Sequence, residues 1–168
     1  PNGPSDYLNY IKKEILDAYI DKIKKFGGID LHIVGVGGRG HLAFHECGIP
    51  LDQEALLVKL DENTIGNAII DGHFKEETFA PKYAISMGSK AVFRAKTVLL
   101  LANGKRKAES IAASLLGEVT DKVPISMAQE YAKNGGNMIY VLEKEAAVGL
   151  TGKFDELKSK GFEVLNTL

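Results

Sequence analysis

Cysteine, tryptophan and long apolar runs are scarce in this sequence. Its 168 residues include one cysteine, Cys47, and no tryptophan. One cysteine cannot form an internal bridge, which excludes a disulfide-stapled miniprotein and fits a reducing compartment. The longest apolar runs, such as residues 97–102, are far shorter than the roughly 20 residues that span a bilayer. Because the amino terminus also lacks a basic region followed by an apolar one, we expect a cytoplasmic protein without a membrane partner.

A strong excess of charge is missing as well. There are 21 basic and 22 acidic residues, which gives a formal net charge of -1. No overall field therefore draws the chain to nucleic acid, and we predict no nucleic-acid partner. The hydrophobic fraction of 45% excludes a disordered chain and can fill one core. The chain begins with Pro1 rather than methionine, so we expect a part of something longer.

The order of apolar patterns predicts an α/β protein. From Tyr7 to Ile23 the apolar residues recur every three or four positions, as on one face of a helix. Ser5 or Asp6 can cap its start, and Gly27 can end it. Near-continuous apolar runs, typical of strands covered on both faces, occupy residues 31–36, 55–60, 97–102 and 137–142.

Helical patterns lie between and after these runs, at residues 105–116, 126–133 and 154–160. A last strand is predicted over 162–165, and the polar residues 71–78 are interpreted as an exposed loop. Right-handed crossovers would make the strands parallel and bring ligand loops to their carboxyl ends. The prediction is a single α/β domain over residues 1–168, a Rossmann-like three-layer sandwich with a mostly parallel sheet flanked by helices.

The most informative stretch is the glycine loop, residues 35–46, which directly follows the first apolar run. Glycines let the backbone turn sharply and approach a ligand closely. A helix starting after the loop would offer unpaired N–H groups and the positive end of its dipole. The loop is therefore expected to bind an anion.

One interpretation of the loop is a dinucleotide site. Gly35, Gly37 and Gly40 satisfy G-x-G-x-x-G, and Asp61 follows about twenty residues later. Gly48 follows within ten residues of Gly40, however, which leaves little room for the crossover helix of such a site. We therefore predict no dinucleotide and no other cofactor.

A second interpretation is a metal site, since His41 and His45 are four residues apart and Glu46 adjoins them. The order differs from His-Glu-x-x-His, and no cluster supplies a third ligand, so we predict no metal.

A third interpretation is acid–base chemistry on a small anionic substrate. Here the His41 imidazole carries a proton near neutral pH, and the Glu46 carboxylate orients the imidazole or keeps it protonated.

The glycine loop resembles the G-x-G-x-D-G-H-I-A-F-N-E segment of the glucosamine-6-phosphate deaminase (isomerase) family. Further motifs follow in the family's order: Pro1-Asn2-Gly3, residues 28–31, 58–60, 80–88, 104–108 and 124–126. The resemblance reaches about Leu150 and corresponds to the carboxyl-terminal two thirds of such an enzyme. The family's G-G-S-T-P phosphate loop and its D-E-Y segment, whose aspartate moves the proton at the carbon bearing nitrogen, are absent from this chain.

The resemblance implies roles for particular residues. His41 and Glu46 match the histidine and glutamate that serve the opening of the sugar ring. The family's aspartate stands two residues before the histidine. Arg39 replaces it here, and a cation lowers the pKa of a nearby histidine where a carboxylate would raise it. Arg39 could instead hold a phosphate, or pair with Glu46 and withdraw it from His41. Lys107 matches the lysine that contacts the sugar phosphate, whereas Ile69 stands where a phosphate-binding arginine belongs.

The expected catalytic residues are thus His41 and Glu46, and the expected substrate or phosphate ligands are Gly37, Gly38, Arg39, Gly40 and Lys107. The implied activity converts an amino-sugar phosphate to a ketose phosphate with release of ammonia, impaired by the changes at positions 39 and 69. The alternatives are a non-catalytic sugar-phosphate-binding protein and a 6-phosphogluconolactonase-like hydrolase. The expected partner is a small sugar phosphate. A sheet edge left exposed predicts a homo-oligomer.

Overall fold

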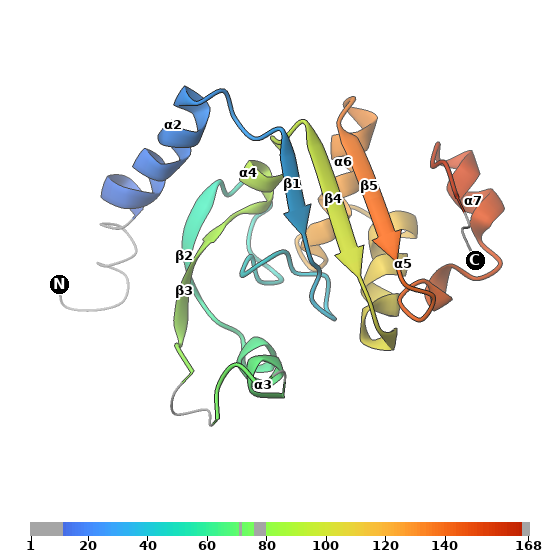
Figure 1. Ribbon diagram of the computed structural model, residues 1–168, viewed down its shortest axis with the longest axis horizontal. Coiled ribbons are helices and arrows are strands. Elements are labelled where there is room, and N and C mark those ends of the chain that lie inside the picture. Colours follow the sequence, from blue (N-terminus) through green and yellow to red (C-terminus); the bar gives the residue numbers. More distant parts are fainter. Residues whose placement is uncertain (1–11, 71, 76–79, 166–168) are drawn as a thin grey trace.

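The computed structural model describes residues 12–70, 72–75 and 80–165, and Figure 1 shows how they are arranged. The described residues start with one π-helical turn, η1 (Lys12–Leu16), which continues into helix α2 (Asp17–Lys25). Helix α2 ends before Gly27 and Gly28, whose φ angles are +90° and +88°. Only glycine adopts this conformation without strain, so the predicted glycine stop is confirmed. The expected start of the helix lies outside the described residues.

The larger of the two sheets in the described structure has three parallel strands (Figure 1). Its strands are β1 (Leu31–Val34), β4 (Thr97–Ala102) and β5 (Asn137–Leu142), in the order β1-β4-β5. In register, Leu31 lies opposite Thr97, which in turn lies opposite Asn137. The α/β fold with a parallel sheet flanked by helices is thus as predicted. The three-stranded sheet carries the glycine loop at the carboxyl end of β1.

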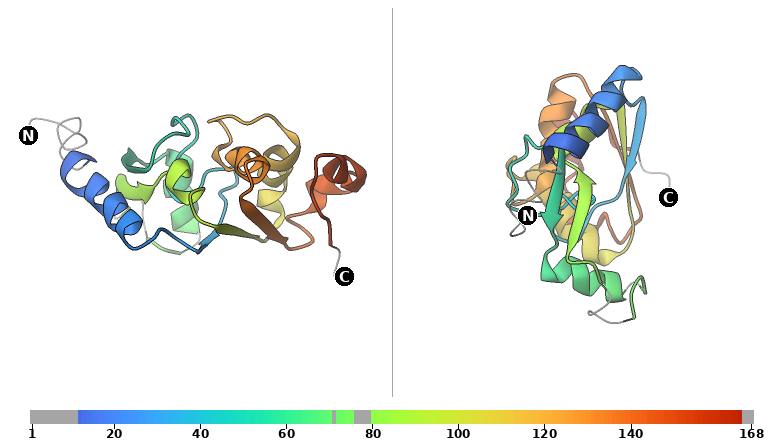
Figure 2. Two further views of the ribbon diagram at one scale, coloured as in Figure 1. Left: turned by 90° about the horizontal axis from the view of Figure 1, so that it is seen from above. Right: turned by 90° about the vertical axis from the view of Figure 1, so that its left-hand side faces the viewer.

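Helices cover one face of this sheet, as the view from above in Figure 2 shows. They include η3 (Lys105–Lys107), α5 (Ala108–Leu116), η4 (Pro124–Ser126) and α6 (Met127–Lys133). Val98 and Leu100 point from β4 into the core, where they pack with Ile111 and Ile125, and all four are fully buried. Burial of this face supplies the main hydrophobic stabilisation of the structure.

The other face of the parallel sheet differs from the expectation that both faces are covered. Along β4 buried side chains alternate with half-buried or exposed ones, and along β5 exposed side chains alternate with half-buried ones, as on a sheet with one covered face. Five apolar side chains on the outer face are exposed in the described structure: Leu31, Ile33, Leu101, Ile139 and Val141. An apolar run therefore did not establish that both faces are covered by this chain.

A second sheet corrects the prediction that residues 55–60 add a parallel strand to the first. Strand β2 (Ala55–Lys59) instead pairs antiparallel with β3 (Tyr83–Met87), with Ala55 opposite Met87. Helix α3 (Glu62–Ile70) lies between the two strands in sequence. Neither α3 nor β3 was predicted as an element. The connection between the two strands contains α3 and is long enough for either direction of pairing, so the sequence did not fix it. The antiparallel unit places α3 beside the glycine loop.

The remaining elements are short. Helix α4 (Ser89–Val92) precedes β4, and η5 (Val148–Leu150) and α7 (Phe154–Ser159) follow β5. The strand predicted over 162–165 is wrong, because these residues form no ladder. Residues 72–75 of the predicted loop contain neither helix nor strand, and its other residues lie outside the described structure. None of the described helices combines the length and apolar character that crossing a membrane requires.

Candidate functional site

The glycine loop leaves the carboxyl end of β1 and turns back on itself. The Gly37 N–H donates to the His41 carbonyl at 3.0 Å, and the Gly40 N–H donates to the Gly37 carbonyl at 2.9 Å. No helix follows, since residues 41–52 form turns and an isolated bridge. The helix start expected after the loop is therefore wrong, whereas anion binding by the loop stays a prediction. The same finding removes the crossover helix that a dinucleotide site requires.

Two glycines in the loop are required by close packing. A side chain on Gly37 would fall on the imidazole of His41, closer than any permitted van der Waals contact. Gly40 has a φ of +88°, and a Cβ there would lie 2.7 Å from Cγ1 of Val123. The backbone of Gly37 thus forms the surface against which the His41 ring lies.

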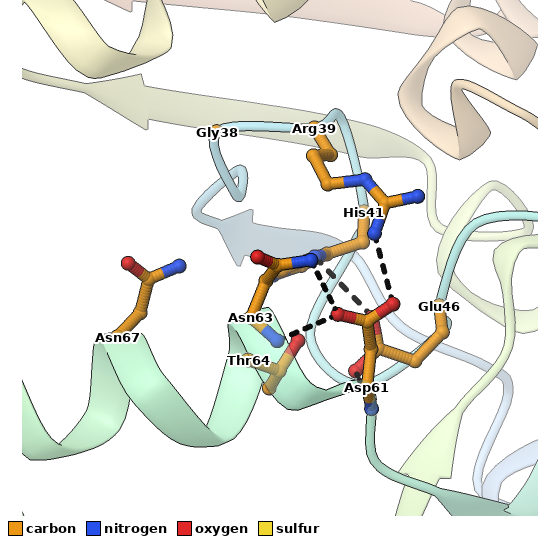
Figure 3. Close-up of a pocket in the computed structure, with 8 residues that line it drawn as sticks. All are labelled: Gly38, Arg39, His41, Glu46, Asp61, Asn63, Thr64 and Asn67. Carbon is orange, nitrogen blue, oxygen red and sulfur yellow. Dashed lines mark hydrogen bonds and ion pairs between the residues drawn. The ribbon is translucent and has the colours of Figure 1, made fainter.

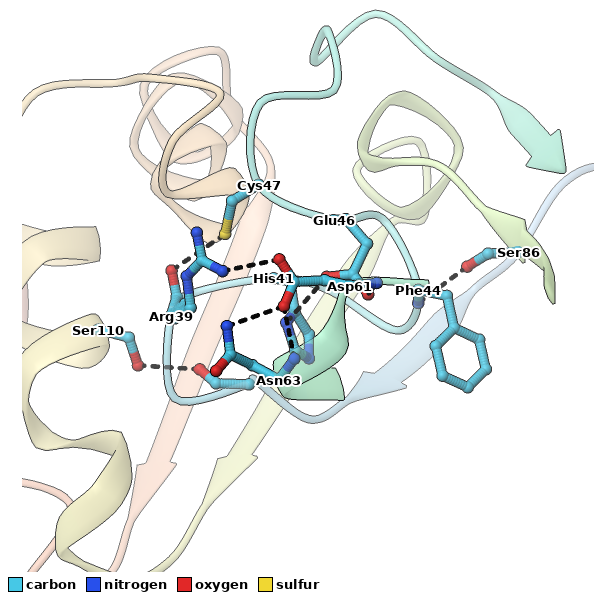
Figure 4. Close-up of polar contacts among 10 residues, drawn as sticks. Arg39, His41, Phe44, Glu46, Cys47, Asp61, Asn63, Ser86 and Ser110 are labelled. Carbon is cyan, nitrogen blue, oxygen red and sulfur yellow. Dashed lines mark hydrogen bonds and ion pairs between the residues drawn. The ribbon is translucent and has the colours of Figure 1, made fainter. Parts of the chain in front are cut away.

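Further hydrogen bonds hold the loop to its surroundings (Figure 4). The Ser110 hydroxyl of α5 donates to the Gly37 carbonyl at 3.1 Å, and the Phe44 N–H donates to the Ser86 hydroxyl of β3 at 3.1 Å. The Cys47 thiol donates weakly to the Arg39 carbonyl at 3.4 Å. The loop is therefore fixed by α5 on one side and by β3 on the other, which favours a defined position for its side chains.

His41 and Glu46 come together, as the spacing suggested. His41 Nδ1 lies 3.5 Å from Glu46 Oε2, and both side chains are largely buried. Burial lowers the pKa of His41, and the charges of Lys107 and Arg39 lower it further, while Glu46 and Asp61 act in the opposite direction. Because the pKa is below its ordinary value of 6.5, the imidazole is mainly uncharged at pH 7. It can accept a proton there.

Arg39 pairs with Asp61 rather than with Glu46. Its Nη1 lies 2.8 Å from Asp61 Oδ2. The other carboxylate oxygen of Asp61 accepts the Asn63 N–H at 2.7 Å and the Asn63 side-chain amide at 2.9 Å, so Asp61 caps helix α3. These hydrogen bonds and the nearby Arg39 charge hold the pKa of Asp61 below its ordinary value despite partial desolvation.

These side chains surround a pocket of about 140 Å³, drawn in Figure 3. From the glycine-loop segment, Gly38, Arg39, His41 and Glu46 line it. From α3 and the residue that caps it, Asp61, Asn63, Thr64 and Asn67 complete the lining.

The four residues from the α3 side were not predicted as site residues. Asp61 belongs to the sequence pattern of the dinucleotide interpretation, which gives it no role beside Arg39, His41 or Glu46. The available signal was Asp-x-Asn directly after an apolar run, a pattern typical of a helix start. Of the other expected residues, Gly37 and Gly40 belong to the same loop. Lys107 precedes α5 and lies near enough to His41 to lower its pKa by charge.

His45 has a different position from His41. It is fully buried, its Nδ1 accepts the Ser89 N–H at 3.0 Å, and its Nε2 donates to the Ile49 carbonyl at 3.1 Å. Both ring nitrogens are therefore occupied by the backbone, which excludes His45 as a metal ligand in this arrangement. Across the described residues, no three acidic, histidine or cysteine side chains gather in a way that would hold a metal ion.

Stability should decrease on mild acidification, because burial lowers the pKa of His32, His41 and His45 below 6.5. Below pH 6.5 the unfolded chain binds protons that the folded chain rejects, so the free energy of unfolding falls by up to about 1.4 kcal/mol per pH unit for each imidazole. Above pH 6.5 this contribution is complete. Urea unfolding at pH 7.5 and 5.5 measures the difference, and equal midpoints at the two pH values would contradict it.

Comparison with known proteins gives a consistent result. A glucosamine-6-phosphate deaminase of Clostridium botulinum (strain Kyoto / Type A2) is 37% identical over 91% of this chain and 59% of its own length. One of Alkaliphilus oremlandii (strain OhILAs) is 40% identical over 88% of this chain and 57% of its own length. The chain thus spans about three fifths of the curated relatives it matches. No protein-family model matches it.

The solved structures include a monomeric glucosamine-6-phosphate deaminase with a TM-score of 0.72 and 27% identity, which covers 80% of this chain and 53% of that one. A 6-phosphogluconolactonase from Trypanosoma cruzi has a TM-score of 0.54 and 24% identity, over 81% of this chain and 51% of that one. The second likeness concerns the fold alone. The first agrees with the sequence relatives.

Proposed function

We propose, from its homology to glucosamine-6-phosphate deaminases over about nine tenths of its length, that this chain binds an amino-sugar phosphate and opens its ring. The observation that carries the proposal is the His41–Glu46 pair at 3.5 Å on the wall of a polar pocket. In the complete reaction the opened aldose becomes a ketose phosphate, one water is consumed and ammonia is released. The ring-opening step is the part for which this chain has suitable residues.

Ring opening moves a proton from the hydroxyl at the anomeric carbon to the ring oxygen while the bond between that carbon and the ring oxygen breaks. An uncharged imidazole can accept the first proton and return it to the ring oxygen. Glu46 stabilises the imidazolium formed in between, because its carboxylate already lies beside Nδ1. The low pKa of His41 makes the accepting form abundant at neutral pH. Neither residue is consumed in the cycle.

For the phosphate, the proposed ligands are the loop glycines Gly37, Gly38 and Gly40 together with the cations Arg39 and Lys107. Because the Gly37 and Gly40 N–H groups already donate within the loop, these two glycines would act by shaping it. Gly38 and Arg39 line the pocket, and Lys107 lies within electrostatic range of His41. A guanidinium and an ammonium both suit a phosphate, although Arg39 would exchange its Asp61 partner to bind one. We also propose that residues 1–168 act as one α/β domain and assemble as a homo-oligomer.

The experiment measures exchange between the α and β anomers of glucosamine 6-phosphate by NMR, because ring opening is the step common to both directions. We expect the chain to accelerate exchange and His41→Ala to abolish about 99% or more of that acceleration, since a general acid–base group contributes about 100-fold or more. The exposed His73 provides the matched control, His73→Ala, which should exchange at the original rate.

Other outcomes separate the alternatives. Thermal stabilisation by glucosamine 6-phosphate without faster exchange would favour the non-catalytic sugar-phosphate-binding protein. Hydrolysis of 6-phosphogluconolactone that depends on His41 would favour the lactonase-like alternative. The fold of this chain is similar to that of the Trypanosoma cruzi 6-phosphogluconolactonase. No response to either compound would reject all three. Ammonia release is assayed in parallel, and we expect little or none from this chain alone.

A further inference from the structure

Arg39 places a competing cation beside the acid–base pair. Arg39 and Glu46 line the same pocket, and a guanidinium binds carboxylates through two parallel N–H donors. If Arg39 bound Glu46, the carboxylate would be drawn from His41 and its charge would be neutralised. Instead, Arg39 Nη1 lies 2.8 Å from Asp61 Oδ2. The Asp61 carboxylate, rather than that of Glu46, is therefore the ion-pair partner of Arg39.

Three hydrogen bonds besides the ion pair fix the carboxylate and the N–H group of Asp61. Its Oδ1 accepts both the Asn63 N–H and the Asn63 side-chain amide, at 2.7 and 2.9 Å. Its own N–H donates to Glu46 Oε1 at 3.3 Å, while Glu46 Oε2 faces His41. One residue thus binds the competing cation with its side chain and orients the carboxylate of the pair with its backbone (Figure 3).

The charges that face His41 are balanced. Glu46 and Asp61 favour the protonated ring, and Lys107 and Arg39 oppose it. Two carboxylates therefore stand against two cations. Removal of the Asp61 charge would leave Arg39 without its ion-pair partner and give the cations the excess.

We propose that Asp61 is a positioning residue that keeps Arg39 away from Glu46 and so preserves the His41–Glu46 pair. The proposal rests on the proposed function for its consequence in catalysis, but the electrostatic effect on His41 exists with or without a substrate. Asp61 acts through Arg39 and Glu46. The Arg39–Asp61 pair also joins the glycine loop to the start of α3, which are the two walls of the pocket.

The test is a double-mutant cycle with Asp61→Asn and Arg39→Gln, read by NMR titration of the His41 imidazole. Asparagine retains an oxygen that can accept the Asn63 N–H and is an equally good helix cap, so the first variant removes charge with little change in shape. Arg39 is more than half exposed, and its replacement leaves the core intact. The His41 signal is assigned by its loss in His41→Ala. Asp155→Asn, on the exposed surface of α7, is the matched control.

We expect shifts that do not add. The pKa of His41 should fall in Asp61→Asn and rise in Arg39→Gln, and the double variant should lie close to Arg39→Gln, because Asp61 acts mainly through the Arg39 charge. Asp155→Asn should leave the pKa unchanged. A purely structural role for Asp61 would not be rescued by loss of the Arg39 charge. The proposal would be overturned if Asp61→Asn lowered the pKa of His41 equally with and without Arg39, if neither variant shifted it, or if both shifted it in the same direction.

The sugar-phosphate assay separates this proposal from the one on which it rests. If the original chain accelerates anomer exchange, the acceleration should fall roughly tenfold in Asp61→Asn and recover in the double variant, as expected for partial loss of a general base. If the original chain accelerates nothing, the proposed function fails, while the titrations still decide whether Asp61 controls the pair.

Discussion

Replacing Gly37 by alanine should displace the His41 ring and abolish the chemistry assigned to it. The added Cβ would overlap the imidazole, and the Gly37 backbone has no room to retreat, since its N–H and carbonyl bond to His41, Gly40 and Ser110. A misplacement of about 1 Å typically costs about 100-fold in rate. Overpacking of this kind should also lower the free energy of unfolding by about 1–3 kcal/mol.

The measurements are the anomer exchange of glucosamine 6-phosphate and the NMR titration of His41. A displaced ring becomes better solvated, so its pKa should rise towards the ordinary value. Gly35→Ala is the matched control in the same loop, because a Cβ there meets nothing within 4 Å. The packing account would be wrong if both alanine variants behaved alike, or if the His41 titration in Gly37→Ala kept its original midpoint.

Replacing His45 by alanine should produce the largest loss of stability. The ring is fully buried and bonds to the Ser89 N–H and the Ile49 carbonyl. Its removal leaves a cavity and two backbone groups without their partner. The combination should lower the free energy of unfolding by about 3 kcal/mol or more. The Ser89 bond lies at the first residue of α4, so this short helix should loosen first.

Urea unfolding at pH 7.5 measures the change. The matched control is again His73→Ala, which removes an exposed imidazole and should alter the free energy of unfolding by less than about 0.5 kcal/mol. The His45 variant should also lose part of the decrease in stability between pH 7.5 and 5.5, because one buried imidazole no longer needs to be charged on unfolding. A cost near that of the control would contradict the structural role.

The spacing of His41 and His45 in the sequence does not predict where the two side chains lie. His41 and His45 are four residues apart, which on a helix would put them on one face. The segment forms turns, Ala43 has a φ of +48°, and the two rings serve different purposes. One contacts Glu46 at the pocket and the other contacts backbone in the interior. Spacing alone could not distinguish them, because the separation has meaning only after the local backbone conformation is known.

The sequence predicted only one of the two walls of the pocket. Its glycine-loop wall was predictable, because Gly38, Arg39, His41 and Glu46 are close together in the sequence. Its other wall was not, because α3 comes beside the loop only when β2 pairs with β3 outside the parallel sheet. The choice of Asp61 as the partner of Arg39 spans 22 positions and depends on that arrangement.

The sequence by itself determined the strands of the parallel sheet and the helices after β4, the glycine stop after α2, and the histidine and glutamate that meet at the glycine loop. These features depend on local patterns of apolar residues and on backbone preferences that act over a few residues. Only the tertiary structure decided that β2 leaves the parallel sheet, that one sheet face stays exposed in the described chain, and that Asp61 rather than Glu46 holds Arg39. These outcomes depend on which distant segments bury surface and neutralise charge together, and no local pattern contains that information.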